Sequence, residues 1–152
     1  MQALSMDFPA TILPGCGKTN RSIGNQEGEK PVSDRGKREK GKALARTLLE
    51  GSEIGVRVPK KFVDYNLEHL FGDVWQGDDL TLEERSLVTC TILVALNREA
   101  EQRIHFRAAQ NLGLPRDRIE GMIIHAAHYA GWPVAASAFR VLAEVWPENR
   151  EK

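Results

Sequence analysis

The chain has 152 residues, with 21 basic and 21 acidic side chains, and 41% of its residues are hydrophobic. This length favours one domain with a real core, and the zero net charge gives no global attraction for nucleic acid or an anionic membrane. The two cysteines, Cys16 and Cys90, lie far apart and outside any C-x-x-C or Cys/His cluster. Neither a disulfide framework nor a zinc site is therefore expected.

Residues 1–36 are predicted to form a flexible polar tail, and residues 37–152 a helical domain. The tail is rich in Gly, Ser, Asn, Pro and charge, a composition that buries too little apolar surface to offset the entropy of ordering. Its short apolar patch has no basic segment ahead of it, so no secretory signal is expected. No apolar run reaches the roughly 20 residues that span a bilayer. We therefore expect a cytoplasmic protein that binds neither membranes nor nucleic acid.

About six helices are predicted from Lys37 onward, so the fold class is expected to be all-α. The first helix ends at Gly51, a residue type common just after a helix. The second begins near Pro59, because proline is favoured in a first helical turn, and continues to Trp75. Glycine and proline bound the remaining helices, which are expected over 82–96, 98–112, 115–130 and 133–145.

The third of these helices is unusually apolar. Thr81 and Glu84 have the spacing of a capping box, and residues 87–96 then follow without a charge. The β-branched run VTCTILV is also compatible with a buried strand, but the cap and the length favour a helix. A helix that is apolar around its whole circumference must be surrounded. Since a domain of this size has little else to surround it with, the run favours contacts between subunits.

The next helix carries a candidate proton-transfer pair. Glu101 and His105 are four residues apart, so their side chains share one face of the helix. A carboxylate and an imidazole beside an apolar helix can move protons near neutral pH. The alternative is a surface pair that contributes only a few tenths of a kcal/mol to helix stability.

Several pieces of the chain resemble the carboxymuconolactone decarboxylase family. These pieces are RSLVT, ALNRE, the H-x-R-A-A helix and YAGWP, within a resemblance that covers residues 37–147. The resemblance implies an alkylhydroperoxidase D-like helical bundle that assembles as trimers or hexamers. It also implies a cofactor-independent and metal-independent decarboxylase of a small carboxylated lactone, of the 4-carboxymuconolactone type, in the β-ketoadipate pathway of aromatic catabolism.

The chain departs from its relatives at three places. The peroxidase branch carries C-x-x-C-x-x-x-H, and its cysteines fall here on Arg98 and Glu101, which excludes disulfide-based peroxidase chemistry at this motif. The decarboxylases usually read W-S-R-P-G-L after the second helix, where this chain reads WQGDDL and lacks the arginine. They also tend to read P-A-A-N where this chain has PVAA from Pro133. These changes affect which acid is expected to bind.

With the resemblance, His105 is the expected proton donor, and Glu101 is expected to orient its ring and raise its pKa. Arg85 is the candidate anchor for a substrate carboxylate, with an ion pair to Glu83, Glu84 or a neighbouring helix as the equal alternative. The expected walls of the substrate pocket are Trp75, His125, Tyr129 and Trp132. His125 and His128 are three residues apart, but no third metal ligand is evident.

Two other functions stay open. One is a relative on the same scaffold that does not decarboxylate, but acts on another small unsaturated acid or a reactive small molecule. The other is a non-catalytic binding or assembly protein, in which Glu101 and His105 form only a subunit contact.

Overall fold

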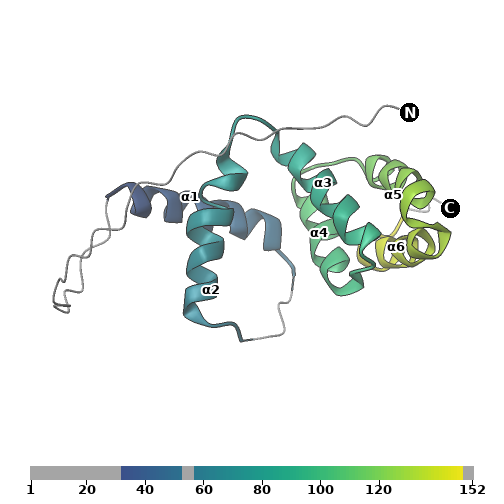
Figure 1. The fold of residues 1–152 in the computed structure, drawn as a ribbon, viewed down its shortest axis with the longest axis horizontal. Helices are drawn as coiled ribbons and strands as arrows, with labels where there is room; N and C mark the ends of the chain where they lie inside the picture. Colours follow the sequence, from purple (N-terminus) through teal and green to yellow (C-terminus); the bar gives the residue numbers. More distant parts are fainter. Residues whose placement is uncertain (1–31, 53–56, 149–152) are drawn as a thin grey trace, which may run out of the picture.

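The computed structural model describes residues 32–52 and 57–148, and every regular element in these two ranges is a helix (Figure 1). The elements are α1 (Val32–Leu49), α2 (Lys60–Tyr65), the π-helical turn η1 (Asn66–Leu70), the 3₁₀ turn η2 (Val74–Gln76), α3 (Leu82–Ala95), α4 (Glu99–Asn111), α5 (Arg116–Ala130) and α6 (Trp132–Val145). The expected all-α fold is confirmed. None of the helices in these ranges is long and apolar enough to cross a membrane.

Helices α3 to α6 form a bundle, and the remaining helices form a second layer beside it (Figure 1). Phe106 on α4 lies at the centre of the bundle with no exposed surface. It packs among buried side chains from all four helices: Cys90, Val94, Ala109, Leu114, Ile119, Ile123, Ala126, Ala127, Ala135, Ala138, Val141 and Leu142. Burial of this apolar surface is the main force that holds the four helices together.

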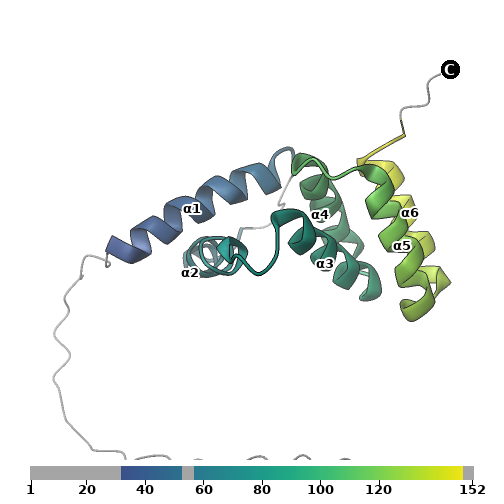
Figure 2. The same ribbon diagram turned by 90° about the horizontal axis from the view of Figure 1, so that it is seen from above.

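The segment Lys60–Gln76, which we call the arm, stands apart from the bundle and is attached to it through α1 (Figure 2). The backbones of α1 and the arm touch directly at their crossing. A Cβ atom on Gly41 would overlap the carbonyl oxygen of Leu67, and one on Gly72 would overlap the carbonyl oxygens of Lys37 and Leu67. Only glycine permits such an approach, so these two residues fix the arm against α1.

Charged contacts reinforce the same crossing. The Nη1 atom of Arg38, on α1, donates to Asp64 at 2.6 Å and to Glu68 at 2.8 Å. Lys60 also pairs with Asp64 at 2.6 Å, and the two cations lower the pKa of this carboxyl group to about 2. At the other end of α1, the side-chain amide of Asn111 donates to the carbonyl oxygens of Thr47 and Glu50 at 3.0 and 3.1 Å. This bond ties the end of α1 to the end of α4.

Most of the expected helix boundaries are confirmed to within one residue. Thr81 and Glu84 form both bonds of the capping box, and the expected stops Gly51, Gly113 and Gly131 all have positive φ. The apolar run expected to be a helix rather than a strand is α3.

Two boundaries differ from expectation. Helix α1 begins at Val32, inside the expected tail, because one isolated glycine at Gly36 costs a helix only about 1 kcal/mol. The remaining tail residues, 1–31, lie outside the described ranges. The prediction of a single helix over 59–75 is wrong. After α2 the chain forms the π turn η1, and this turn ends before Gly72, where the backbone meets α1. The spacing of apolar residues does not encode that contact.

The residues that the structure describes do not surround helix α3. Val88, Ile92 and Leu96 recur every fourth residue along one face, and all three are at least half exposed, Leu96 to 65%. We call this face the α3 stripe. Exposed apolar side chains in a contiguous row mark surfaces that bind another molecule.

The crossing of α1 and the arm can be tested with two glycines of the same helix. We expect Gly41→Ala to lower the free energy of unfolding by about 1–3 kcal/mol or more, because its Cβ overlaps backbone that cannot yield. The matched control is Gly36→Ala, which meets no atom within 4 Å and should raise this free energy by up to about 1 kcal/mol. Urea unfolding of both variants is the measurement, and equal effects would contradict the crossing.

Candidate active site

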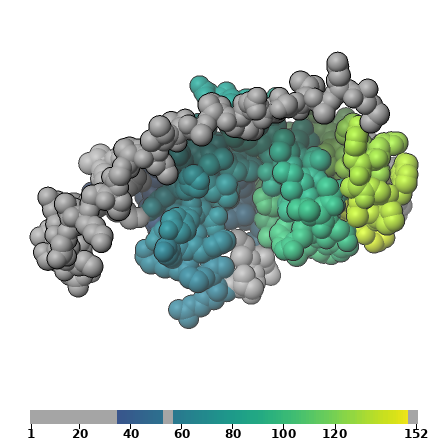
Figure 3. Space-filling view, in the orientation of Figure 1, coloured from purple at the N-terminus to yellow at the C-terminus, as the bar shows by residue number. Residues whose placement is uncertain are grey.

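A cavity of about 1140 Å³, which we call the arm cavity, lies between the arm and helix α4. Figure 3 shows the hollow that separates the arm from the bundle. Its walls are mostly apolar side chains of α1 and the arm, facing polar side chains of α3 and α4. The lining residues include Leu49, Phe62, Leu67, Leu70, Phe71, Trp75, Thr89, Glu101, Arg103, Ile104, His105 and Arg107. A largely apolar hollow with a few converging polar groups is the usual form of a small-molecule site.

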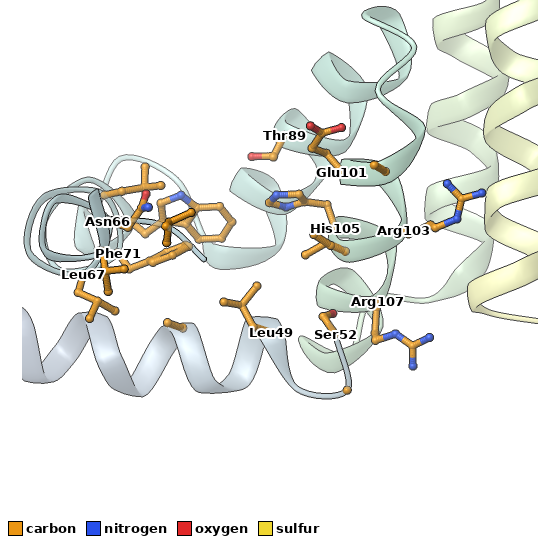
Figure 4. A pocket seen from close by; sticks show the side chains of 18 of the residues that line it. Leu49, Ser52, Asn66, Leu67, Phe71, Thr89, Glu101, Arg103, His105 and Arg107 are labelled. Carbon is orange, nitrogen blue, oxygen red and sulfur yellow. The ribbon is translucent and has the colours of Figure 1, made fainter. Parts of the chain in front are cut away.

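His105 extends from α4 into this cavity (Figure 4). Its position follows from the fold of α4, whose Phe106 side points into the bundle core while the neighbouring side faces the arm. Within the described ranges, the imidazole ring has no hydrogen-bond partner. Burial lowers the pKa of His105 below its ordinary value, and the nearby charge of Glu101 opposes this shift without overcoming it.

Glu101 lines the same cavity one helical turn before His105, but its carboxylate pairs with another residue. It accepts hydrogen bonds from Nη2 and Nε of Arg98 at 2.7 and 3.4 Å, and this pairing lowers the pKa of Glu101. The structure shows no hydrogen bond from Glu101 to His105. The expectation that Glu101 orients the ring is therefore not supported. Glu101 does raise the pKa of His105, as expected, but burial lowers this pKa by more, so the net shift is downward.

Arg85 does not line the arm cavity, although its side chain is only 10% exposed. Its Nη2 donates to Asp79 at 2.5 Å and to the carbonyl oxygen of Gly77 at 3.2 Å. The ion-pair alternative is thus present, with a loop aspartate in place of Glu83 or Glu84. The Nε atom of Arg85 is buried and has no hydrogen-bond partner among the described residues. A buried guanidinium N–H without a partner is costly, which leaves this arginine able to gain from an added acceptor.

The expected pocket walls divide between two places. Trp75 is buried, packs edge-to-face on Phe71 and lines the arm cavity. The other three residues, His125, Tyr129 and Trp132, lie where α5 meets α6 and are absent from its lining. Tyr129 is 82% exposed and Trp132 is 67% exposed. In one chain, these three side chains form an exposed aromatic corner, and their role in the pocket stays a prediction.

Some lining residues were not expected from the sequence. Thr89 lies one helical turn after Arg85 and belongs to the RSLVT piece, which is the one signal that could have indicated it. Arg103 also lines the cavity, and its Nε and Nη2 atoms donate hydrogen bonds to the carboxylate of Glu144 on α6 at 2.9–3.1 Å. Arg107 extends away from His105 (Figure 4), and a Cβ atom on Gly51 would lie 3.5 Å from it. The arginine charges are therefore either paired or directed away from the imidazole.

Within the ranges that the structure describes, no three His, Cys, Asp or Glu side chains gather where they could hold a metal ion. The ring of His125 contacts that of Tyr129 at a centroid distance of 5.0 Å, and the ring of His128 contacts that of Trp132 at 5.6 Å. The polar groups that line the arm cavity include the imidazole of His105, the hydroxyl of Thr89 and the carboxylate of Glu101.

Comparison with known proteins gives a family match and two named relatives. The profile of the Carboxymuconolactone decarboxylase family matches residues 60–144. The chain is 37% identical over 87 residues to the 4-carboxymuconolactone decarboxylase of Acinetobacter baylyi, a match that covers 57% of this chain and 65% of that protein. It is 34% identical over 74 residues to the nitrosuccinic acid decarboxylase of Metarhizium robertsii, covering 49% of this chain and 52% of that protein. In both cases the match spans less than two thirds of the relative.

The electrostatic state of His105 can be measured directly. We expect NMR titration to place its pKa below 6.5, because burial disfavours the charged ring. Glu101→Gln should lower this pKa further, since Glu101 is the charge that raises it. The control is Glu99→Gln in the same helical turn, where the carboxylate acts on Arg103 instead. An unchanged His105 titration in Glu101→Gln would show that this carboxylate does not act on the ring.

Proposed function

Because the chain belongs to the carboxymuconolactone decarboxylase family, we propose that it is a cofactor-independent decarboxylase of a small carboxylated lactone or a closely related acid. The observation that carries this proposal is the place of His105, which extends into a cavity walled by apolar side chains. The names of both relatives describe decarboxylases of small acids. A purely structural Glu101–His105 contact would not need such a cavity beside it.

The reaction sets three requirements. The carboxylate must be held, the electron pair it leaves behind must pass to an electron-poor group of the substrate, and a proton must reach carbon. In a carboxylated unsaturated lactone the electron-poor group is the conjugated carbonyl, and in a nitro acid it is the nitro group. The protein then supplies binding, orientation and the proton, without a cofactor.

His105 is the proposed proton donor. In the empty cavity the lowered pKa keeps its ring neutral near pH 7. A bound acid brings negative charge next to the ring and so favours the imidazolium form. The charge of Glu101 also favours the imidazolium form of His105, although Glu101 forms its hydrogen bonds with Arg98 and not with the ring. The substrate thus helps to protonate the group that later gives its proton to carbon.

Arg85 remains the proposed carboxylate anchor, although it does not line the arm cavity and its Nε–H, which has no hydrogen-bond partner among the described residues, is buried. Asp79 already neutralises one side of this guanidinium. Asp79 belongs to the WQGDDL segment, where the family usually has an arginine. In the pattern W-S-R-P-G-L the arginine falls on Gly77 and the glycine on Asp79, so the segment loses a cation and gains an anion beside the anchor. This change favours a substrate with fewer carboxylates than 4-carboxymuconolactone. The same observation supports the second candidate function, a relative that acts on another small unsaturated acid without decarboxylating it.

We further propose that the chain forms a homo-oligomer, a trimer or hexamer, through the α3 stripe. A second copy is the occupant, because the stripe is apolar like a subunit core and lacks the charges of a solvated face. The exposed aromatic corner of Tyr129 and Trp132 is a second candidate contact, where the expected pocket residues could reach a neighbouring subunit's cavity.

Catalysis by His105 is tested with the full chain and a panel of acids that includes 4-carboxymuconolactone and nitrosuccinic acid, by following carbon dioxide release. We expect His105→Gln to lower kcat by about 10²- to 10⁴-fold. The control His69→Gln changes an exposed ring that does not line the cavity and should be active. In the wild type, kcat/KM should fall as pH rises through the lowered pKa of His105, because the imidazolium is the acid. Carbon dioxide release at the wild-type rate by His105→Gln would contradict this role.

The interface is tested with one buried-charge variant. Ile92→Glu places a carboxylate in the α3 stripe, and we expect it to convert the oligomer to smaller species, because a charge at a subunit core is costly. Ala43→Glu adds the same charge on exposed α1 and should leave the oligomer intact. Light scattering coupled to gel filtration measures both. A wild-type monomer, or an unchanged oligomer in Ile92→Glu, would overturn the proposed interface.

A further inference from the structure

Thr89 is a lining residue of the arm cavity that the proposed chemistry has not yet used. It extends from α3 into the same part of the cavity as His105, which extends from α4 (Figure 4). Cys90, the residue after Thr89, contacts α4 at the same level, because its Sγ donates to the carbonyl oxygen of His105 at 3.6 Å. Burial raises the pKa of the Cys90 thiol to about 12, so it stays a protonated donor. Thr89 is therefore one residue away from a direct contact between α3 and His105.

The hydroxyl group of Thr89 differs from that of its neighbour Thr91. Thr91 donates to the carbonyl oxygen of Leu87 at 2.7 Å, the usual bond of a threonine inside a helix. Thr89 makes no such bond, and its hydroxyl has no hydrogen-bond partner within the described ranges. It is also not sealed away from solvent, unlike the partnerless hydroxyls of Ser52 and Ser86. The free O–H of Thr89 is therefore open to a molecule in the cavity.

The described arginines in and beside the arm cavity are paired or directed away from this position. Arg98 is bound to Glu101, Arg103 is bound to Glu144, and Arg107 extends away from the ring. Beside His105, a small molecule would meet the hydroxyl of Thr89 and the indole of Trp75. A neutral hydrogen-bond donor held in an apolar cavity is the arrangement that stabilises a developing negative charge on oxygen.

We propose that Thr89 donates a hydrogen bond to the substrate oxygen that takes up the electron pair released on decarboxylation. This inference rests on the proposed function. The bond to the carboxylate carbon breaks, carbon dioxide leaves, and its electron pair moves through the conjugated system to that oxygen. The oxygen accepts the O–H of Thr89, which keeps its proton. His105 then gives its proton to carbon, the electron pair returns to form the C–H bond, and water restores the proton of the imidazole.

A hydrogen bond from Thr89 to the substrate defines the substrate class more closely. The acid must carry a carbonyl or nitro oxygen conjugated to the carbon that loses the carboxylate, placed so that the oxygen reaches Thr89 while the carbon lies beside His105. A carboxylic acid without such an oxygen has nothing for Thr89 to stabilise. It would bind to the cavity without turnover.

Three variants test the role of Thr89 in the full chain. Thr89→Val keeps the shape of the side chain and removes the hydroxyl, and we expect kcat to fall by about 10²-fold or more with little change in KM. Thr89→Ser keeps the hydroxyl and should retain most of the activity. Thr91→Val removes the hydroxyl that is already bonded within the helix and should be close to wild type. Circular dichroism and thermal melting confirm that each variant is folded.

The outcomes separate this inference from the function on which it rests. A wild-type protein that releases no carbon dioxide from any acid of the panel overturns the proposed decarboxylase, and the role of Thr89 with it. An active wild type with an equally active Thr89→Val overturns the role of Thr89 alone. Equal losses in Thr89→Val and Thr91→Val, or a loss in Thr89→Ser as large as in Thr89→Val, would show a structural effect and also overturn it.

Discussion

The contact between the backbones of α1 and the arm is the constraint on which the site depends. The backbones approach so closely at Gly41 and Gly72 that no side chain fits at this crossing. Arg38 also forms ion pairs there with two carboxylates of the arm. The crossing positions the arm across from α4, and the space between the arm and α4 is the arm cavity. Without the arm, His105 would lie on an open helix face. Two glycines far from the reacting groups therefore decide whether those groups are enclosed.

Enclosure has an electrostatic consequence that links the structure to the chemistry. The apolar wall lowers the pKa of His105, and the pairing of Arg98, Arg103 and their acids leaves little free charge beside it. The cavity therefore gains most from a ligand that brings its own negative charge and an oxygen acceptor. A small conjugated acid has both. The imidazole of His105 and the hydroxyl of Thr89 both face the cavity, and such a molecule would complete their hydrogen bonds.

The sequence predicted what depends on local signals. The capping box at Thr81 and the regular Gly and Pro residues set the ends of the helices, and the amphipathic spacing placed His105 and Glu101 on one face of α4. It could not predict what depends on contacts between distant segments. The π turn lies where Leu67 meets Gly41 of α1. Arg85 pairs with a loop aspartate, and Glu101 pairs with Arg98 because a full cation three residues away competes better than a neutral ring. Thr89 was missed for the same reason: only the packing of α3 on α4 brings it beside His105.

The central claim is that the acid binds in the arm cavity between α3, α4 and the arm. The most direct measurement is a crystal structure of the full chain with an unreactive, saturated lactone carboxylate. We expect the ligand to lie between Trp75 and α4, with its carbonyl oxygen within hydrogen-bond distance of Thr89 and its ring carbon against His105. A ligand bound only at the aromatic corner of Tyr129 and Trp132, with the arm cavity filled by water, would contradict the account.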